Sequence, residues 1–216
     1  MTRKIKPLIY VFWEGESEQA YAKYLKSYFQ DVAVIRLPST PGLFAEAYNM
    51  FRNNPRYRNN AEITDEIWFF FDVEVEKACH WDMNYKIITR LRKLRKPGRI
   101  KIRLLMTTAC FEYWMLLHYE RTAPAIATPA DKERIKERLK KYVPYYAKGN
   151  CEAIREIARH HRKAIENGKW TLLSLVEDGL PTLEDCDERN CWLFLGTHTF
   201  TTVHEALEFL YKLKKE

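Results

Sequence analysis

Two uninterrupted apolar runs, each ending at an acidic residue, constrain the fold of this 216-residue chain most strongly. Leu8–Trp13 is rich in β-branched and aromatic residues and stops at Glu14, and Ile67–Phe71 stops at Asp72. Runs without a polar face are typical of strands that are buried on both sides of a parallel sheet. Such strands need helices on both faces of the sheet, which predicts an α/β protein.

Segments in which apolar residues recur at helical spacing alternate with these strands. The spacing predicts helices over 16–29, 43–51, 82–96 and 110–119. Two further strands are predicted over 32–37 and 99–106, and the polar stretch 53–60 around Pro55 predicts an exposed connection. We therefore expect a mostly parallel, Rossmann-like sheet of four strands, flanked by helices that form right-handed crossovers.

From residue 126 onward the pattern becomes mainly helical. Helices are predicted over 129–142, over 150–166 with a stop at Asn167-Gly168, and from about Thr202 to the end. No internal repeat or low-complexity tract interrupts the chain. We expect a single domain over 1–216, with an α/β core over 1–125 and a helical completion over 126–216.

Composition narrows the class of protein. Hydrophobic residues make up 46% and aromatic residues 14% of the chain, which excludes general disorder. The apolar runs fall far below the ~18 residues that a membrane span needs, and none near the start is long enough for a signal peptide. Five cysteines, an odd number without a Cys-x-x-Cys pair, predict reduced thiols. We expect a cytoplasmic protein without a membrane partner.

Acidic residues that follow the central strands form the candidate site. Glu14 follows the first strand, and Asp72, Glu74 and Glu76 follow the third. Ligands of open α/β sheets bind at this edge, and alternate residues of an extended segment share a face about 6.5 Å apart. Carboxylates held this close repel one another, and Mg²⁺ with its preference for oxygen ligands would join them. The alternative is a helix cap at Asp72 followed by a solvated loop.

Further polar residues are candidates for the same site. Glu112 begins a predicted helix only a few residues after the fourth strand, so it can reach the same edge. Lys148 lies in a loop, where it either meets a phosphate or is simply exposed to solvent. His118 has apolar neighbours and fits a hydrogen-bonded core histidine better than a catalytic group. His160 and His161, with basic neighbours, are predicted to belong to a basic helix face rather than to a metal site.

A basic run accounts for much of the net charge of +7. Between Lys77 and Arg103 the lysines and arginines are opposed only by Asp82. A solvated helix face is the ordinary explanation of such a run, whereas beside a phosphate-handling site it becomes a nucleic-acid surface. We expect the run to flank the acidic cleft and to bind nucleic acid through Lys86, Arg90, Lys93 and Arg99.

Five short stretches, in this order and spacing, resemble the motifs of a known family. Tyr10–Glu18 resembles the first motif of the Toprim fold, a strand that ends in Glu-Gly, and Phe71–Glu76 resembles its second, normally Asp-x-Asp. Together with Phe111–His118, Tyr142–Lys148 and Thr199–His204 they resemble the RloB-like family, a Toprim-related group often found beside restriction and phage-defence genes. The resemblance spans nearly the whole chain.

A metal-dependent phosphodiesterase centre is what this resemblance implies. Glu14 is expected to act as general acid/base or metal ligand, and Asp72 and Glu74 are expected to hold Mg²⁺ or Mn²⁺, with Glu76 as a further carboxylate. The ion polarises the scissile phosphate and stabilises charge on the attacking and leaving oxygens. Glu112 and Lys148 complete the expected catalytic set.

The sequence departs from the family pattern at two places. Glu74 stands where Asp is usual, and Thr108-Ala109 stand where Asn-Pro is expected. The resemblance implies a magnesium-dependent endonuclease of a prokaryotic antiviral defence system, acting on DNA or RNA, with tRNA suggested by family analogy. The sequence leaves open whether the protein binds other defence proteins and whether it forms a homo-oligomer.

Two other functions remain as alternatives. One is a non-catalytic module that binds nucleic acid or a partner complex and uses its acidic residues only structurally. The other, a polymerase- or ligase-type phosphoryl transferase, is disfavoured because the sequence contains no phosphate-binding Gly-x-x-x-x-Gly-Lys-Ser/Thr loop.

Overall fold

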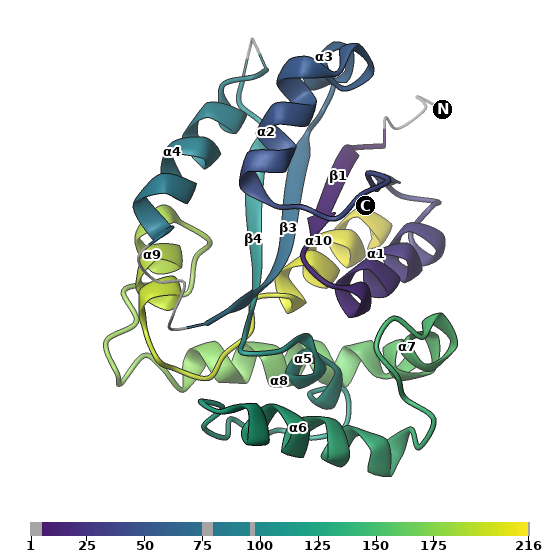
Figure 1. Ribbon diagram of the computed structural model, residues 1–216, viewed down its shortest axis with the longest axis vertical. Coiled ribbons are helices and arrows are strands. Elements are labelled where there is room, and N and C mark those ends of the chain that lie inside the picture. Colours follow the sequence, from purple (N-terminus) through teal and green to yellow (C-terminus); the bar gives the residue numbers. More distant parts are fainter. Residues whose placement is uncertain (1–5, 75–79, 96–97, 216) are drawn as a thin grey trace.

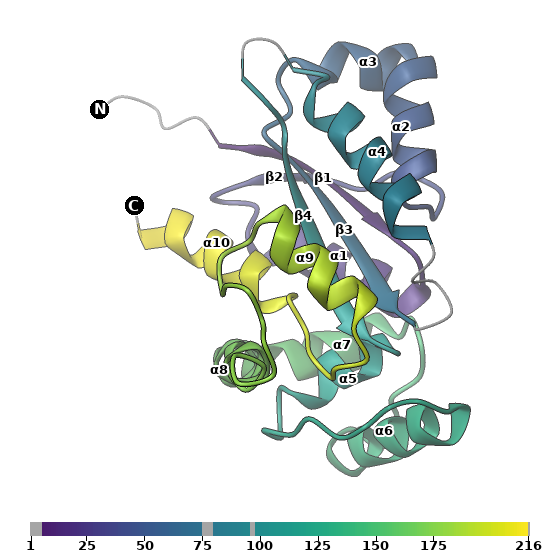
Figure 2. The same cartoon turned by 90° about the vertical axis from the view of Figure 1, so that its left-hand side faces the viewer.

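A parallel sheet with helices on both faces forms the centre of the protein (Figures 1 and 2). The computed structural model describes residues 6–74, 80–95 and 98–215. Its strands are β1 (Leu8–Trp13), β2 (Val34–Arg36), β3 (Glu66–Val73) and β4 (Lys101–Thr108). They pair in the order β2-β1-β3-β4, and every pairing is parallel. The predicted α/β fold class is confirmed, and both apolar runs are buried central strands.

Strand residues alternate between two apolar layers. Ile9, Val11 and Trp13 of β1 join one layer, and the intervening residues join the other. The first layer is covered by α1 (Glu16–Tyr28), α5 (Phe111–Leu116) and α10 (His204–Lys215). The second is covered by α2 (Phe44–Asn53), α4 (Trp81–Arg92) and α9 (Asp187–Leu195). In β3, Trp68 and Phe70 face the first layer, so the same alternation turns Asp72 toward α1 and α5.

Helices of the second half of the chain close the molecule below the carboxyl ends of the strands (Figure 1). They are α6 (Pro129–Tyr142), α7 (Cys151–Ile157) and α8 (His161–Leu173), the last two joined by a short 3-10 turn. Their apolar residues, such as Ile135, Ile154 and Ala164, belong to the same buried cluster as Val11 of β1. Within the described ranges, no helix is long and apolar enough to cross a membrane.

The polar stretch before β3 corrects one prediction. The stretch is largely exposed, as predicted, but it forms the helix α3 (Pro55–Ala61) instead of an irregular connection. The Asn54 side chain accepts a hydrogen bond from the backbone N–H of Arg56, and Pro55 occupies the first helical turn. Proline there is compatible with a helix because its missing N–H would have had no partner inside the helix.

Asn167-Gly168 does not end a helix, which corrects a second prediction. Both residues lie inside α8 and are buried. The Asn167 side chain donates to the backbone oxygen of Leu117 at 2.7 Å, and the bare Cα of Gly168 lies against His204 at the start of α10. The pair is therefore explained by close packing between helices and not by chain termination.

The motif Thr199–His204 fastens the C-terminal segment to the outer edge of β4. Thr202 Oγ1 donates to the backbone oxygen of Leu104 at 2.7 Å and accepts from the N–H of Met106 at 2.8 Å. Thr107 and Thr201 form an antiparallel bridge. An unpaired strand edge is a template for association with other chains, and this segment covers part of it.

The contact between Gly168 and His204 generates a stability test. A Cβ at position 168 would lie 2.9 Å from Nδ1 of His204, which is closer than side-chain carbons pack. We expect Gly168→Ala to lower the free energy of unfolding by about 1–2 kcal/mol, although alanine is the better helix former. Denaturant titration of the purified variant measures this change.

A double-mutant cycle supplies the control for that change. His204→Ala removes the ring but keeps the Cβ of residue 204, which lies 3.0 Å from the position of a Cβ at residue 168. We therefore expect Gly168→Ala to destabilise the protein less in this background than in the wild type. Equal destabilisation in both backgrounds would contradict the packing explanation.

Candidate active site

The carboxyl ends of β1 and β3 lead into one small cleft of about 200 Å³. All five residues predicted to be catalytic line it: Glu14, Asp72, Glu74, Glu112 and Lys148. They come from four different segments of the chain, so only the fold brings them together. Glu76, the remaining predicted metal ligand, lies outside the described residues.

Asp72 lines this cleft from the end of β3. Its backbone belongs to β3 and pairs in register with Thr107 of β4. The side-chain oxygen Oδ1 is buried and has no hydrogen-bond partner among the described residues. Burial, and then the charges of Glu18, Glu112, Glu14 and Glu74, raise the pKa of Asp72 well above its usual range.

Glu18 is a site residue that the sequence interpretation missed. Its position in the first helical turn predicts only a favourable interaction with the helix dipole, yet its side chain is buried at 4% exposure. Burial raises its pKa to about 7, with the charges of Glu112 and Glu14 acting in the same direction. The position of Glu18 in the sequence could have indicated this role. A helix that starts directly after β1 holds its first-turn residues at the same edge of the sheet as Glu14.

Gly15 makes room for this carboxylate. A Cβ at position 15 would lie 2.7 Å from Oε2 of Glu18, closer than such atoms approach. The backbone of Gly15 is extended, so no left-handed conformation requires glycine here. The glycine of the Glu14-Gly15 pair is therefore explained by the space that Glu18 occupies.

Glu112 is held in place by two hydroxyl groups. Tyr146 Oη donates to its Oε1 at 2.9 Å, and Ser17 Oγ lies 3.4 Å from the same oxygen. The two hydroxyls are themselves 3.1 Å apart. Burial, and then the charge of Glu112, raise the pKa of Tyr146, so the phenol remains a hydrogen-bond donor. These contacts hold the carboxylate of Glu112 in place.

Two lysines lie at the acidic cleft. Lys148 is exposed at its mouth, and the following Gly149 has a φ of +70° and packs against Glu16. Lys132, on α6, forms an ion pair with Glu74. Glu74 thus faces a lysine, where the sequence predicted a metal ion.

The turn between β4 and α5 contains strained backbone. Ala109 has a φ of +63° and is the only non-glycine residue with positive φ among those described. Its N–H donates to the backbone oxygen of Val73 at 2.9 Å, which ties the turn to the end of β3. A left-handed alanine costs about 1–2 kcal/mol, and such strain often accompanies functional sites. Thr108-Ala109, which stand where Asn-Pro is expected, therefore lie in the turn that sets the position of Glu112.

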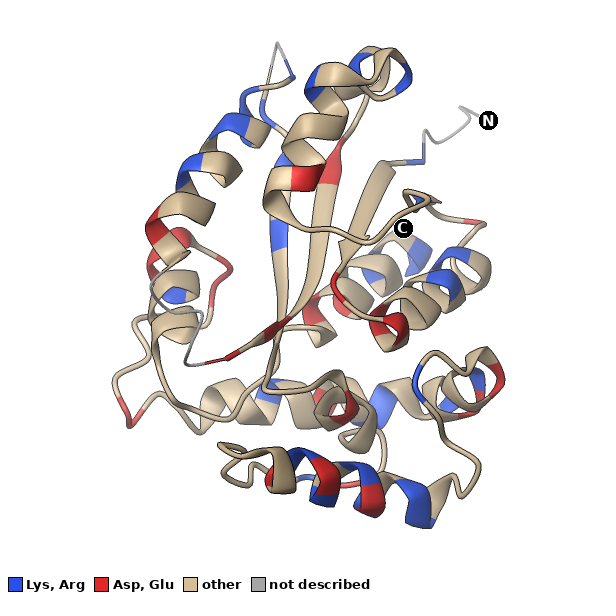
Figure 3. Cartoon of the chain, viewed as in Figure 1, with Lys and Arg blue, Asp and Glu red and all other residues tan. Residues whose placement is uncertain are grey.

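None of the described cations of the basic run lines the acidic cleft, which corrects a third prediction; Lys77 and Lys96 lie outside the described residues. Only the start of α4 reaches the site, where His80, Met83 and Asn84 line a second cleft beside Glu14 and Asp72. A helix in a crossover runs back along the sheet, so its C-terminal half leads to the opposite edge. Figure 3 shows the lysines and arginines of α4 toward that far end. The exposed residues there are Lys86, Arg90, Lys93 and Arg99.

Four of the eight described cations of the run pair with acidic residues that are distant in sequence. Arg92 pairs with Asp187 and Arg95 with Asp65. The last two cations of the run, Lys101 and Arg103, pair with Asp185 and Glu66 respectively. The sequence alone does not show these partners. The number of lysines and arginines in the run is therefore larger than the number of unpaired positive charges.

The histidines take structural positions. His118 is fully buried, its Nδ1 lies 3.1 Å from the backbone oxygen of Trp114, and burial lowers its pKa to about 3. It is a neutral core histidine, as predicted. His161 is buried and contacts Ala158 and Tyr211, so the predicted basic face excludes it. His160 is exposed.

The acidic cluster fits a divalent cation by its chemistry. Among the described residues, no three His, Cys, Asp or Glu side chains are already arranged to hold a metal ion. The available donors are carboxylate oxygens, which Mg²⁺ prefers, and Oδ1 of Asp72 is buried without a partner. Asp72 and Glu18 retain protons that a cation would replace. Binding therefore requires the carboxylates to turn toward a common point.

Fold and site together define an α/β protein with a buried carboxylate cluster at the carboxyl edge of its parallel sheet. The family model described as RloB-like protein matches residues 9–210, so this chain belongs to the RloB-like family. No curated protein and no solved structure matches the chain.

The raised pKa of Glu18 gives a pH test. In the unfolded chain Glu18 ionises near pH 4.5, and in the folded protein near pH 7. Folding therefore binds a proton in this window, and the free energy of unfolding falls as pH rises from about 4.5 to 7. We expect Glu18→Gln to melt roughly 5 °C above the wild type at pH 8 without divalent cations, and level with it at pH 4.

Two comparisons complete the pH test. The exposed substitution Glu177→Gln should leave the melting temperature unchanged at both pH values. Mg²⁺ at pH 8 should raise the melting temperature of the wild type but not that of Asp72→Asn. A gap between wild type and Glu18→Gln that stays constant from pH 4 to pH 8 would contradict the buried-acid interpretation.

Proposed function

We propose that this chain is a magnesium-dependent nucleic-acid endonuclease of a prokaryotic antiviral defence system. The observation that carries the proposal is the convergence of the buried side chains of Glu18 and Glu112 with Asp72, whose Oδ1 is buried, and with Glu14 and Glu74. Burying mutually repelling acids opposes folding, and side chains with raised pKa in a cleft mark functional sites. The endonuclease chemistry and the defence role are what the RloB-like resemblance suggests for such a centre.

Mg²⁺ bound here would polarise the scissile phosphate and stabilise charge on the attacking and leaving oxygens. Asp72 and Glu74 are assigned to hold the ion, with Glu18 as a further carboxylate. Glu14 is exposed at the rim, where its carboxylate can take the proton of the attacking water. Lys148, also exposed, is assigned to attract the phosphate.

One observation favours the alternative of a non-catalytic binding module. The ion pair between Glu74 and Lys132 neutralises a predicted metal ligand without any metal. If the protein is such a binding module, its acidic residues serve only to hold α6 and the loop with Lys148 in place. The two functions differ in whether the protein cleaves nucleic acid.

A cleavage assay tests the proposed activity. Purified protein is incubated with end-labelled DNA, RNA and tRNA in Mg²⁺, Mn²⁺ or EDTA. We expect cleavage only with a divalent cation, and a rate lower by about 100-fold or more in Asp72→Asn, because the variant loses a ligand carboxylate. Glu14→Gln should also lose most of its activity.

Asp178→Asn is the matched control, since its carboxylate is exposed and does not line the cleft. It should cut like the wild type. Cleavage that is equal in the wild type and Asp72→Asn would contradict the assignment of the centre. Binding without cleavage in any metal would favour the module instead.

A further inference from the structure

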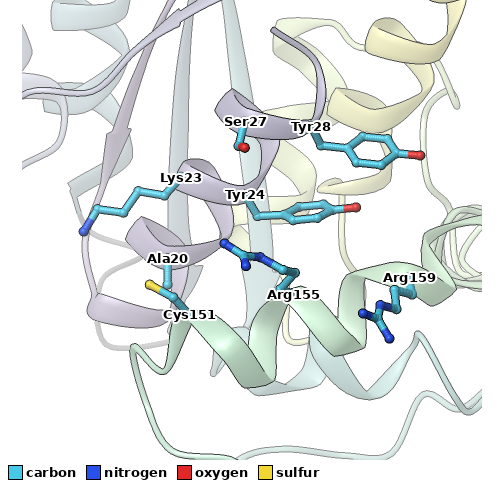
Figure 4. A pocket seen from close by; sticks show the side chains of 8 residues that line it. All are labelled: Ala20, Lys23, Tyr24, Ser27, Tyr28, Cys151, Arg155 and Arg159. Atoms are coloured by element: carbon cyan, nitrogen blue, oxygen red, sulfur yellow. The ribbon is translucent and has the colours of Figure 1, made fainter.

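A second, larger cavity lies between α1 and α7 (Figure 4). Its volume is about 630 Å³, roughly three times that of the acidic cleft. Lys23, Tyr24, Ser27 and Tyr28 line it from α1, and Arg155 and Arg159 line it from the side of α7. We call this cavity the α1–α7 groove.

The groove is strongly basic. Its lining contains three cations, Lys23, Arg155 and Arg159, and no acidic residue. Both arginines are exposed, and within the described part of the chain neither forms an ion pair or a side-chain hydrogen bond. This differs from the run on α4, where Arg92 is bound to an aspartate. Guanidinium groups present a planar set of donors that matches phosphate oxygens.

Two aromatic rings form one wall of the groove. Tyr24 and Tyr28 stack with their ring centroids 5.4 Å apart and their planes inclined by 22°. Tyr28 is 42% exposed, so its ring is accessible from solvent. Aromatic surface beside cations is the combination that binds single-stranded nucleic acid, because bases stack on the rings while phosphates meet the cations.

The groove leads away from the acidic cleft. The helix α1 begins at Glu16, which lines the cleft, and α7 follows directly on Lys148-Gly149. The Cα of Gly149 packs so closely on Glu16 that a Cβ there would lie 3.0 Å from its side chain. The two helices that wall the groove therefore diverge from a shared contact at the mouth of the cleft.

We propose that the α1–α7 groove binds single-stranded nucleic acid, with phosphates on Arg155 and Arg159 and an unpaired base against Tyr24 and Tyr28. A strand held there extends toward Lys148 and the carboxylates. This inference names the substrate form for the proposed endonuclease and rests on that function only for the cleavage step, since binding is measured separately.

Binding is tested in an Asp72→Asn background with EDTA, so that no cleavage interferes. Fluorescence anisotropy follows short labelled single-stranded DNA and RNA. We expect the double substitution Arg155→Glu and Arg159→Glu to weaken binding by at least about 10-fold and to reduce the slope of log K against log salt by about 1–2. Tyr24→Leu keeps apolar volume without a stacking ring and should weaken binding by about 10-fold.

The charge control is the double substitution Arg52→Glu and Arg58→Glu, which makes the same change in net charge on exposed positions of α2 and α3. It should bind like the parent. The proposal is overturned if the parent binds no oligonucleotide, if the groove variants bind as the parent does, or if Lys86→Glu with Arg90→Glu abolishes binding while the groove variants retain it.

The outcomes also separate this inference from the proposed function. If the groove variants lose binding while the protein with intact Asp72 cleaves nothing, the binding proposal is supported and the endonuclease proposal is contradicted. If the protein with intact Asp72 cleaves and the groove variants bind normally, the endonuclease proposal is supported and the binding proposal is contradicted.

Discussion

Repulsion among carboxyl groups that are buried at one edge of the sheet is the constraint on which the other features depend. Parallel pairing of β1 with β3 brings Glu14 and Asp72 to this edge, and helices α1 and α5 add Glu18 and Glu112. In water these groups would ionise and separate. Here burial and proximity keep two of them protonated at pH values where they are normally charged. The proposed divalent cation would resolve this conflict without loss of the fold.

The motifs that suggested the family serve two purposes in the structure. Some build the site: Gly15 leaves space for Glu18, and Tyr146 hydrogen-bonds Glu112. Others stabilise the fold: Thr202, for example, hydrogen-bonds the C-terminal segment to β4. His118, in the same motif as Glu112, is a core residue. Resemblance at a motif therefore does not by itself identify a site residue, and burial and contacts are needed to separate the two.

The central strands and their terminal acids were predictable because an apolar run without a polar face has few alternatives to a buried parallel strand. Features that depend on packing between distant segments were not. Glu18 looked like an ordinary first-turn glutamate until α5 placed Glu112 beside it. Gly168 looked like a helix end because its contact with His204 lies outside its own segment. The sequence predicts the basic run at the cleft because the run begins at the end of the Asp72 motif, and it does not show acidic partners such as Asp187, which are far away in sequence.

The most direct measurement is a crystal structure of the protein soaked with Mn²⁺ at pH 8, where the acids are most ready to release their protons. Our interpretation predicts an anomalous-difference peak in bonding contact with a carboxylate oxygen of Asp72 and with at least one other carboxylate of the cluster. A cluster without such a peak, with Lys148 or Lys132 turned inward to neutralise Asp72, would contradict it. The buried acids would then be a structural feature, stabilised by the protein's own lysines.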